Sequence, residues 1–144
     1  MANRNWTSIQ IISNKIKLDH HDEETLSEVL KEGWGSSIEH ADKDVIGLNG
    51  KYDFPKEDVV SIYNELIKRD EDLEMTVACE CEMFDYIVGG FGNKNGITFE
   101  ERWPGNEEYV DAMEDEREEE YEKELQEWQW TLINQCREKL TEAR

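Results

Sequence analysis

Carboxylates are the most concentrated reactive groups in this sequence. From Glu107 to Glu127, twelve residues are acidic and two, Arg117 and Lys123, are basic, which leaves ten net negative charges, half of the formal net charge of −20. If this stretch is one α-helix, it spans about 32 Å and carries about one carboxylate per 2.6 Å. Duplex DNA carries about one phosphate charge per 1.7 Å of its axis. The charge density is therefore of the order found in nucleic acids.

Such a run of like charges destabilises an isolated helix. Each like-charged pair at i,i+4 costs about 0.2–0.5 kcal/mol, so the seven pairs in this stretch cost on the order of 1.4–3.5 kcal/mol. Pairing of Glu119 with Lys123 and of Glu114 with Arg117 offsets part of this cost. A basic groove would relieve it further, although a solvated helix face is the alternative interpretation. The predicted partner-binding residues are Glu107, Glu108, Asp111, Glu114, Asp115, Glu116, Glu118, Glu119, Glu120, Glu122 and Trp130.

An apolar stripe on the same helix would hold these carboxylates against the rest of the protein. On a helical wheel the stripe is about 140° wide and contains Val110, Met113, Tyr121, Leu125, Trp128, Leu132 and Cys136. Trp130 projects away from it. An exposed tryptophan near the end of a helix can anchor a partner or a second copy of the chain, so a homodimer is one alternative.

Cysteine and histidine side chains offer a second kind of chemistry. Cys79 and Cys81 are two residues apart, and His20, His21 and His40 are potential further metal ligands. The sequence contains no CxxC or HxxxH pair that would complete a tetrahedral zinc site. Because both thiols point to the same face of a strand, we predict that they pack in the core and that no metal is bound.

Carboxylate pairs could also act as acid/base groups or bind a metal. Glu80, Glu82 and Asp85 could pair with Glu100 and Glu101 across a hairpin. Such pairs arise by chance in a chain with 36 acidic residues. No GxSxG, P-loop, HExxH or Rossmann glycine motif is present. We predict no catalytic residues, no cofactor and no enzymatic activity, with a carboxylate metal-dependent enzyme as an alternative.

The composition indicates one folded domain of 144 residues with a lean core. Five Trp, five Tyr and four Phe residues argue against disorder. A pI near 4.4 disfavours direct binding to nucleic acid or to an anionic membrane and favours basic partners. Three cysteines, no apolar leader and no long apolar run indicate an intracellular protein without a transmembrane helix, which we expect in the cytoplasm of a host cell.

The elements that would position these groups follow from hydrophobic periodicity and turn residues. Strands are expected at 6–12, 73–82, 86–91 and 97–101, and helices at 22–33, 55–69 and from Asn106 onward. Residues 34–54 suggest short strands or a structured loop. Gly89 and Gly90 indicate a bulge or a close backbone approach. The expected fold is α+β, ferredoxin-like, with helices on one face of a mainly antiparallel sheet; residues 1–105 form the α+β sandwich, and residues 106–144 form a long acidic helix packed on it or extending from it.

Three short features resemble a known family. They are Asn5-Trp6 at the entry of a strand, Phe54-Pro55 at the start of a helix, and the acidic strand Glu80-Cys81-Glu82 followed by Gly89-Gly90. Together they resemble the ferredoxin-like YubB-type family of small plasmid and phage proteins over residues 5–100. The resemblance implies a ferredoxin-like fold and a mobile-element origin, and it implies no catalytic residues.

These observations lead to one functional hypothesis. The protein is expected to be a small acidic inhibitor from a phage or mobile element that binds a basic nucleic-acid-handling host protein by nucleic-acid mimicry. A defence nuclease, such as a restriction or CRISPR effector, is the natural target class. The alternative is an antitoxin-like acidic module that neutralises a basic partner without imitating nucleic acid.

Overall fold

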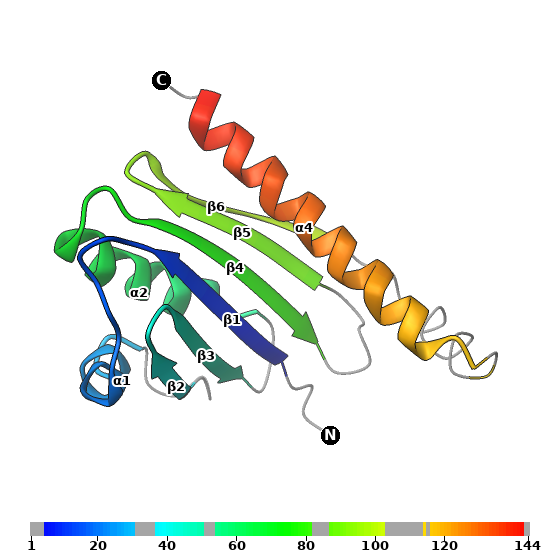
Figure 1. Cartoon of the computed structure of the whole chain (residues 1–144), viewed down its shortest axis with the longest axis horizontal. Coiled ribbons are helices and arrows are strands. Elements are labelled where there is room, and N and C mark those ends of the chain that lie inside the picture. Colours follow the sequence, from blue (N-terminus) through cyan, green and yellow to red (C-terminus); the bar gives the residue numbers. More distant parts are fainter. Residues whose placement is uncertain are drawn as a thin grey trace.

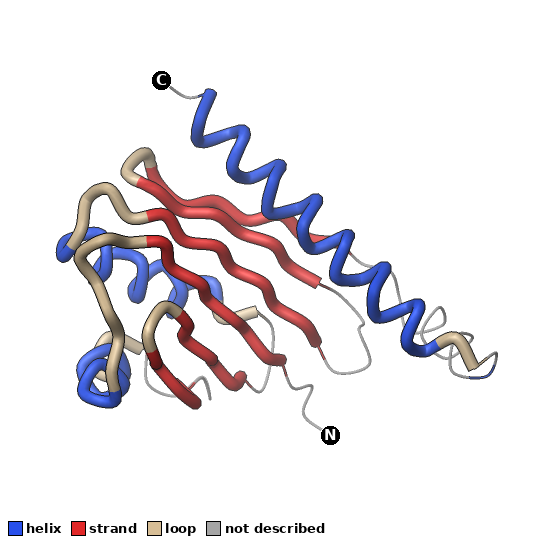
Figure 2. The backbone as a smooth tube through the Cα atoms, in the orientation of Figure 1, coloured by secondary structure: helices blue, strands red, loops and turns tan. Residues whose placement is uncertain are grey.

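The fold is built on one six-stranded antiparallel sheet. The computed structural model describes residues 5–30, 37–50, 54–81, 87–102, 114 and 116–142, with only the backbone described at 81, 118 and 142. Its strands lie in the order β2-β3-β1-β4-β5-β6. Their bounds are β1 (Asn5–Ile12), β2 (Ser37–Asp42), β3 (Val45–Gly50), β4 (Glu74–Cys81), β5 (Ile87–Asn93) and β6 (Gly96–Arg102). Figure 1 shows this sheet between helices on its two faces, and Figure 2 shows the same layers by secondary structure.

Two helices cover the back face of the sheet, which we define by Thr7, Ile9 and Ile11 of β1. They are α1 (His20–Ser27) and α2 (Lys56–Arg69). Alternate β1 residues are buried and exposed, as the period-two pattern predicts. The main core lies between this face and the helices, and includes Ile9, Ile46, Val77, Ile62 and Leu66. The predicted α2 is confirmed, with Pro55 preceding its first residue.

The first helix is shorter than its sequence pattern predicts. Asp19 caps it by accepting hydrogen bonds from the backbone N–H groups of His21 and Asp22, so α1 begins two residues before the expected start at Asp22. It ends at Ser27. Val29 and Leu30 therefore pack against the core from outside the helix. The predicted stop at Gly33 lies outside the described residues.

The long C-terminal helix, α4 (Glu118–Glu142), packs on the front face of the sheet, opposite α1 and α2. Front-face residues Ile87 and Phe91 of β5 meet Leu125, Leu132 and the end of α4. The α+β class and a long C-terminal helix packed on the sheet are therefore established. The expectation that helices lie on one face holds only for α1 and α2. The proposed boundary at residues 105/106 lies outside the described residues.

The start of α4 corrects the sequence prediction. A helix running without interruption from Asn106 was expected. Glu116 instead has a φ of 56°, a left-handed conformation that an α-helix does not contain, and α4 begins at Glu118. The acidic stretch is therefore not one continuous helix.

The hairpin of β5 and β6 forms as predicted. Its pairing from Ile87 to Asn93 is unbroken, so the two glycines mark no bulge. They mark close approaches: a Cβ at Gly89 would lie 2.7 Å from Leu132 Cβ on α4, and one at Gly90 would lie 2.5 Å from the Phe99 ring. β5 is consequently buried on both faces from Ile87 to Gly92. No helix in the described part of the chain is long and apolar enough to cross a membrane.

Candidate protein-binding surface

The predicted partner-binding residues fall into four groups. Glu107, Glu108, Asp111 and Asp115 lie outside the described residues. Glu114 and Glu116 are exposed before the start of α4. Four others, Glu118, Glu119, Glu120 and Glu122, lie in its first two turns, and the last three of these are exposed. Trp130 is 55% exposed in the middle of the helix.

Because α4 begins only at Glu118, the expected repulsion within the helix is lower. Of the seven like-charged i,i+4 pairs, only 118/122 and 120/124 lie within α4. Repulsion in the helix then costs about 0.4–1.0 kcal/mol. The expected ion pair between Glu119 and Lys123 is not formed in the described structure. The local charge stays high, because six Glu and one Lys between residues 118 and 127 give a net charge of −5 over about 15 Å.

Buried contacts hold the acidic half of α4 in a fixed orientation. Tyr121 and Leu125 pack against Ile87 of β5. Gln129, which the predicted apolar stripe did not include, is buried and donates a hydrogen bond from Nε2 to the Cys79 carbonyl oxygen of β4 at 3.0 Å. The stripe residues Leu132 and Cys136 are also buried, as predicted. The exposed carboxylates therefore sit on a rigidly seated helix.

Three carboxylates of α4 point away from the sheet. At about 100° per residue, Glu120, Glu124 and Glu127 lie about 160–220° around the helix from the buried Gln129. All three are exposed, and none has an ion-pair partner in the described part of the chain. Adjacent members are three or four residues apart, so their Cβ atoms lie about 5–6 Å apart. We call these three residues the outer row.

Glu80 connects the sheet to the acidic end of α4. It lies on the front face of β4 and is half-buried. Burial raises its pKa above the usual range of a glutamate, and the negative charge of Glu122 on α4 raises it further. The two carboxylates therefore repel each other where the acidic end of α4 meets the sheet.

The two tryptophans of α4 have different environments. Trp128 is half-buried, with the Arg102 guanidinium 3.7 Å from its ring centre and Tyr121 packed edge-on. Trp130 lies about 200° further around the helix and is exposed. Of these two tryptophans, only Trp130 exposes a large part of its side chain to a partner.

Two described members of the proposed acid/base set, Glu80 and Glu100, have different neighbours. Glu80 pairs across β4 and β5 with Ile87, which in turn pairs with Arg102 of β6. Glu100 instead forms an ion pair with Lys139 on α4, and Glu82 and Asp85 lie outside the described residues. Glu80, Ile87 and Arg102 are therefore successive cross-strand partners on β4, β5 and β6, and the residue of β6 in register with Glu80 is a cation.

The described candidate metal ligands belong to the packed elements of the fold. Cys79 is buried beside Val88 in the core, as predicted, and His20 begins α1. The His40 ring lies over Gly47. Among the described residues, no three His, Cys, Asp or Glu side chains are grouped to hold a metal ion.

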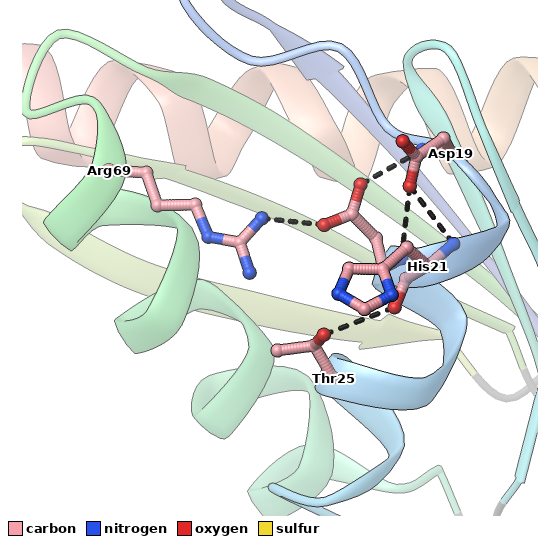
Figure 3. A network of polar contacts seen from close by, with 5 residues as sticks. Asp19, His21, Thr25 and Arg69 are labelled. Carbon is pink, nitrogen blue, oxygen red and sulfur yellow. Dashed lines mark hydrogen bonds and ion pairs between the residues drawn. The ribbon is translucent and has the colours of Figure 1, made fainter.

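A polar network at the start of α1 is also structural. Arg69 of α2 forms an ion pair with Asp22, with a distance of 2.8 Å from Nη1 to Oδ1. Figure 3 shows Arg69 directed toward the start of α1, where Asp19 and His21 lie. The Asp22 carboxylate also accepts a hydrogen bond from the Asp19 backbone. Asp19 and Arg69 thus fix the entry of α1 and its position against α2.

Sequence reasoning missed one exposed aromatic residue. Trp6 on β1 is 45% exposed on the front face, next to Glu80 across the β1–β4 pair. The alternation of β1 placed Trp6 with Ser8 and Gln10, a polar set, and this was the signal that Trp6 faces away from the main core.

Comparisons with known proteins give no assignment. No protein-family model, no curated protein sequence and no solved structure matches the chain. The resemblance to the YubB-type family therefore stays a prediction, and the function must be argued from the surface itself.

Proposed function

We propose that the protein is a small acidic inhibitor, encoded by a phage or mobile element, that binds a basic nucleic-acid-handling protein of its host. In this proposal the carboxylates of α4 occupy a Lys/Arg groove in place of nucleic acid. A defence nuclease, such as a restriction or CRISPR effector, is the proposed target class. Binding requires no cofactor and no catalytic residue of this chain.

The outer row is the observation that carries this proposal. Glu120, Glu124 and Glu127 are exposed on a helix whose opposite side is anchored by Tyr121, Leu125 and Gln129. A preorganised row of charges loses less conformational entropy on binding than a flexible acidic tail. It also attracts a basic partner over a distance and increases the association rate.

The charge density of the helix favours a groove that follows one nucleic-acid strand. A net charge of −5 between residues 118 and 127 corresponds to about one charge per 3 Å of helix. One strand of DNA carries about one charge per 3.4 Å, and a duplex carries one per 1.7 Å. The helical part of the acidic stretch thus resembles a single strand in charge per length.

The first six elements support a ferredoxin-like classification. In chain order they are β1-α1-β2-β3-α2-β4, and their strands lie in the order β2-β3-β1-β4 with all neighbours antiparallel. This order agrees with the split βαβ arrangement of ferredoxin-like domains and supports the proposed classification. In this proposal β5, β6 and α4 are an addition at the β4 edge.

The break at Glu116 favours a second candidate function. A basic partner could be neutralised by the short acidic helix without recognition of a nucleic-acid shape, as an antitoxin-like module would do. The two functions predict different competition on the partner. Nucleic acid and this protein exclude each other from the partner only if the protein acts by mimicry.

The test is capture of host proteins from a bacterial lysate at low salt. The bait is the wild-type protein, the variant E120Q/E124Q/E127Q, or the control variant E24Q/E28Q/E71Q, which removes three exposed charges elsewhere. We expect the wild type and the control to retain the same basic nucleic-acid-binding protein and the outer-row variant to lose it. Equal retention by all three baits would reject the proposal.

A further inference from the structure

The described elements cover only half of the front face of the sheet. α4 lies over β5, β6 and the adjacent side of β4, whereas β1, β2 and β3 have no helix in front of them in Figure 1. Three large apolar side chains are exposed among the described residues, and two of them, Trp6 at 45% and Ile12 at 57%, lie on this open half.

A row of small residues makes the open half concave. Gly47, Ser8, Ala78 and Gly89 are successive cross-strand partners on β3, β1, β4 and β5. At Gly89 the row is filled by Leu132 of α4. At Gly47 it is covered by the His40 ring, and Ser8 and Ala78 form the floor of a shallow groove of about 250 Å³.

Trp6 and Glu80 line this groove on the side nearer the start of α4. They are direct cross-strand partners, and Ile87, the next residue in their row, contacts Tyr121 and Leu125 of α4. Glu39 and His40 line the groove at β2. An aromatic side chain and a carboxylate therefore stand side by side at one edge of the groove.

Among the described residues that line the groove, the charged ones are carboxylates. Strands β1, β2, β3 and β4 contain no Lys or Arg. Glu39 and Glu80 line the groove, and Glu122 of α4 is close enough to Glu80 to raise its pKa. A cationic side chain placed here would relieve this repulsion. Glu80 would lose little further solvation on pairing with it, because Glu80 is already half-buried.

We propose that this groove binds an arginine-bearing segment of the basic partner. A guanidinium can stack on the Trp6 indole while it donates hydrogen bonds to Glu80, and lysine cannot make both contacts with a planar group. The same chain already uses such stacking, with Arg102 on Trp128 at 3.7 Å. A second copy of the chain is a poor occupant, because a two-fold contact through this groove would bring two copies of the same acidic surface together.

This inference rests on the proposed function and adds a second contact to it. The outer row faces away from the sheet, whereas the groove lies beside α4 on the front face. A partner that reaches both would bind with its basic surface on the outer row and one arginine in the groove.

The test uses three synthetic peptides of twelve residues with the isotope-labelled full chain. One alternates Arg and Leu, the second has Lys in place of Arg, and the third has Glu. We expect the Arg peptide to give saturable NMR shifts at Ser8, Gly47 and Ala78, the Lys peptide to bind several-fold more weakly, and the Glu peptide to give no shifts. Shifts confined to the outer row, or no saturable shifts, would overturn the inference.

Variants of the exposed residues separate this contact from general charge attraction. We expect Trp6→Ala to weaken binding of the Arg peptide about tenfold or more, Trp6→Phe to weaken it less, and Glu80→Gln to weaken it and reduce its salt dependence. Gln126→Ala, at an exposed position on α4 outside the groove, is the control and should leave the affinity unchanged. Equal affinities of wild type and Trp6→Ala would overturn the inference even if the peptide binds.

The same variants distinguish failure of this inference from failure of the proposed function. If a captured host protein is lost with E120Q/E124Q/E127Q but binds Trp6→Ala and Glu80→Gln as tightly as wild type, the groove is not a contact and the proposed function stands. If no basic host protein depends on the outer row, the proposed function fails, and the peptide result then stands alone.

Discussion

Glu80 on β4 and Glu122 on α4 form a like-charged pair that links the sheet to the acidic end of the helix. Burial raises the pKa of Glu80, and the charge of Glu122 raises it further. The folded protein therefore keeps a proton on Glu80 to a higher pH than the unfolded chain does. It loses stability as the pH rises from the ordinary glutamate pKa through the raised folded-state pKa.

The first prediction concerns this pair. Glu80→Gln should unfold at a higher urea concentration than wild type at pH 7, because the ionised and half-buried carboxylate is gone. The difference should disappear below the ordinary glutamate pKa, where Glu80 is protonated in both states. Urea unfolding of both proteins from pH 3 to 8 measures the difference at pH 7 and its disappearance at low pH.

Glu122→Gln provides the matched measurement. It should lower the pKa of Glu80, followed by NMR of the side-chain carboxyl carbon, whereas Glu127→Gln on the far side of α4 should leave it unchanged. A Glu80 pKa that is the same in both variants would show that the two carboxylates do not interact.

The second prediction concerns the left-handed residue before α4. Glu116→Gly should raise the free energy of unfolding by up to about 1 kcal/mol, because glycine adopts a positive φ without steric cost. In a continuous helix the same substitution would lower it by about 1 kcal/mol. Glu116→Gln controls for the lost charge, and the sign of the difference between the two variants decides between the two conformations.

The third prediction concerns the buried hydrogen bond that seats α4. Gln129→Ala leaves the Cys79 carbonyl oxygen without its donor and should cost about 1–3 kcal/mol of unfolding free energy. Gln126→Ala, at an exposed position three residues earlier, should change it by less than about 0.5 kcal/mol. Similar values for the two variants in urea unfolding would mean that the bond does not hold the helix.

The fourth prediction concerns the close approach of α4 to β5. A methyl group at Gly89 would lie 2.9 Å from the Gln129 carbonyl oxygen and 2.9 Å from the Ile133 nitrogen, so the helix backbone must move. Gly89→Ala should cost about 1–3 kcal/mol. Gly47→Ala meets only the His40 ring, which can rotate away, and should cost less; a reversed order in thermal unfolding would contradict this packing.

Much of the sheet and α2 could be predicted from local sequence. The period-two pattern of β1 and β4 identified both faces, and Pro55 marked the start of α2. Gly89 and Gly90 indicated a close approach because a glycine pair inside an apolar strand leaves room for another element. These signals are local, so a single sequence carries them.

The corrections come from contacts between distant residues or from single backbone angles. Glutamate is a good helix former, and the residues next to Glu116 do not predict a positive φ at this position. Gln129 was excluded from the apolar stripe because its partner, the Cys79 carbonyl oxygen, is 50 residues away in sequence. The open groove was missed because its floor needs the register of three strands, which places Gly47, Ser8 and Ala78 in one row.

The central claim is that the outer row of α4 replaces nucleic acid in a basic groove. The most direct measurement is displacement of a fluorescent single-stranded oligonucleotide from the captured host protein by this chain, at several salt concentrations. We predict complete displacement by wild type and by E24Q/E28Q/E71Q, weakening steeply with salt, and displacement by E120Q/E124Q/E127Q only at about tenfold or higher concentration. Simultaneous binding of the oligonucleotide and the wild-type protein would contradict the claim.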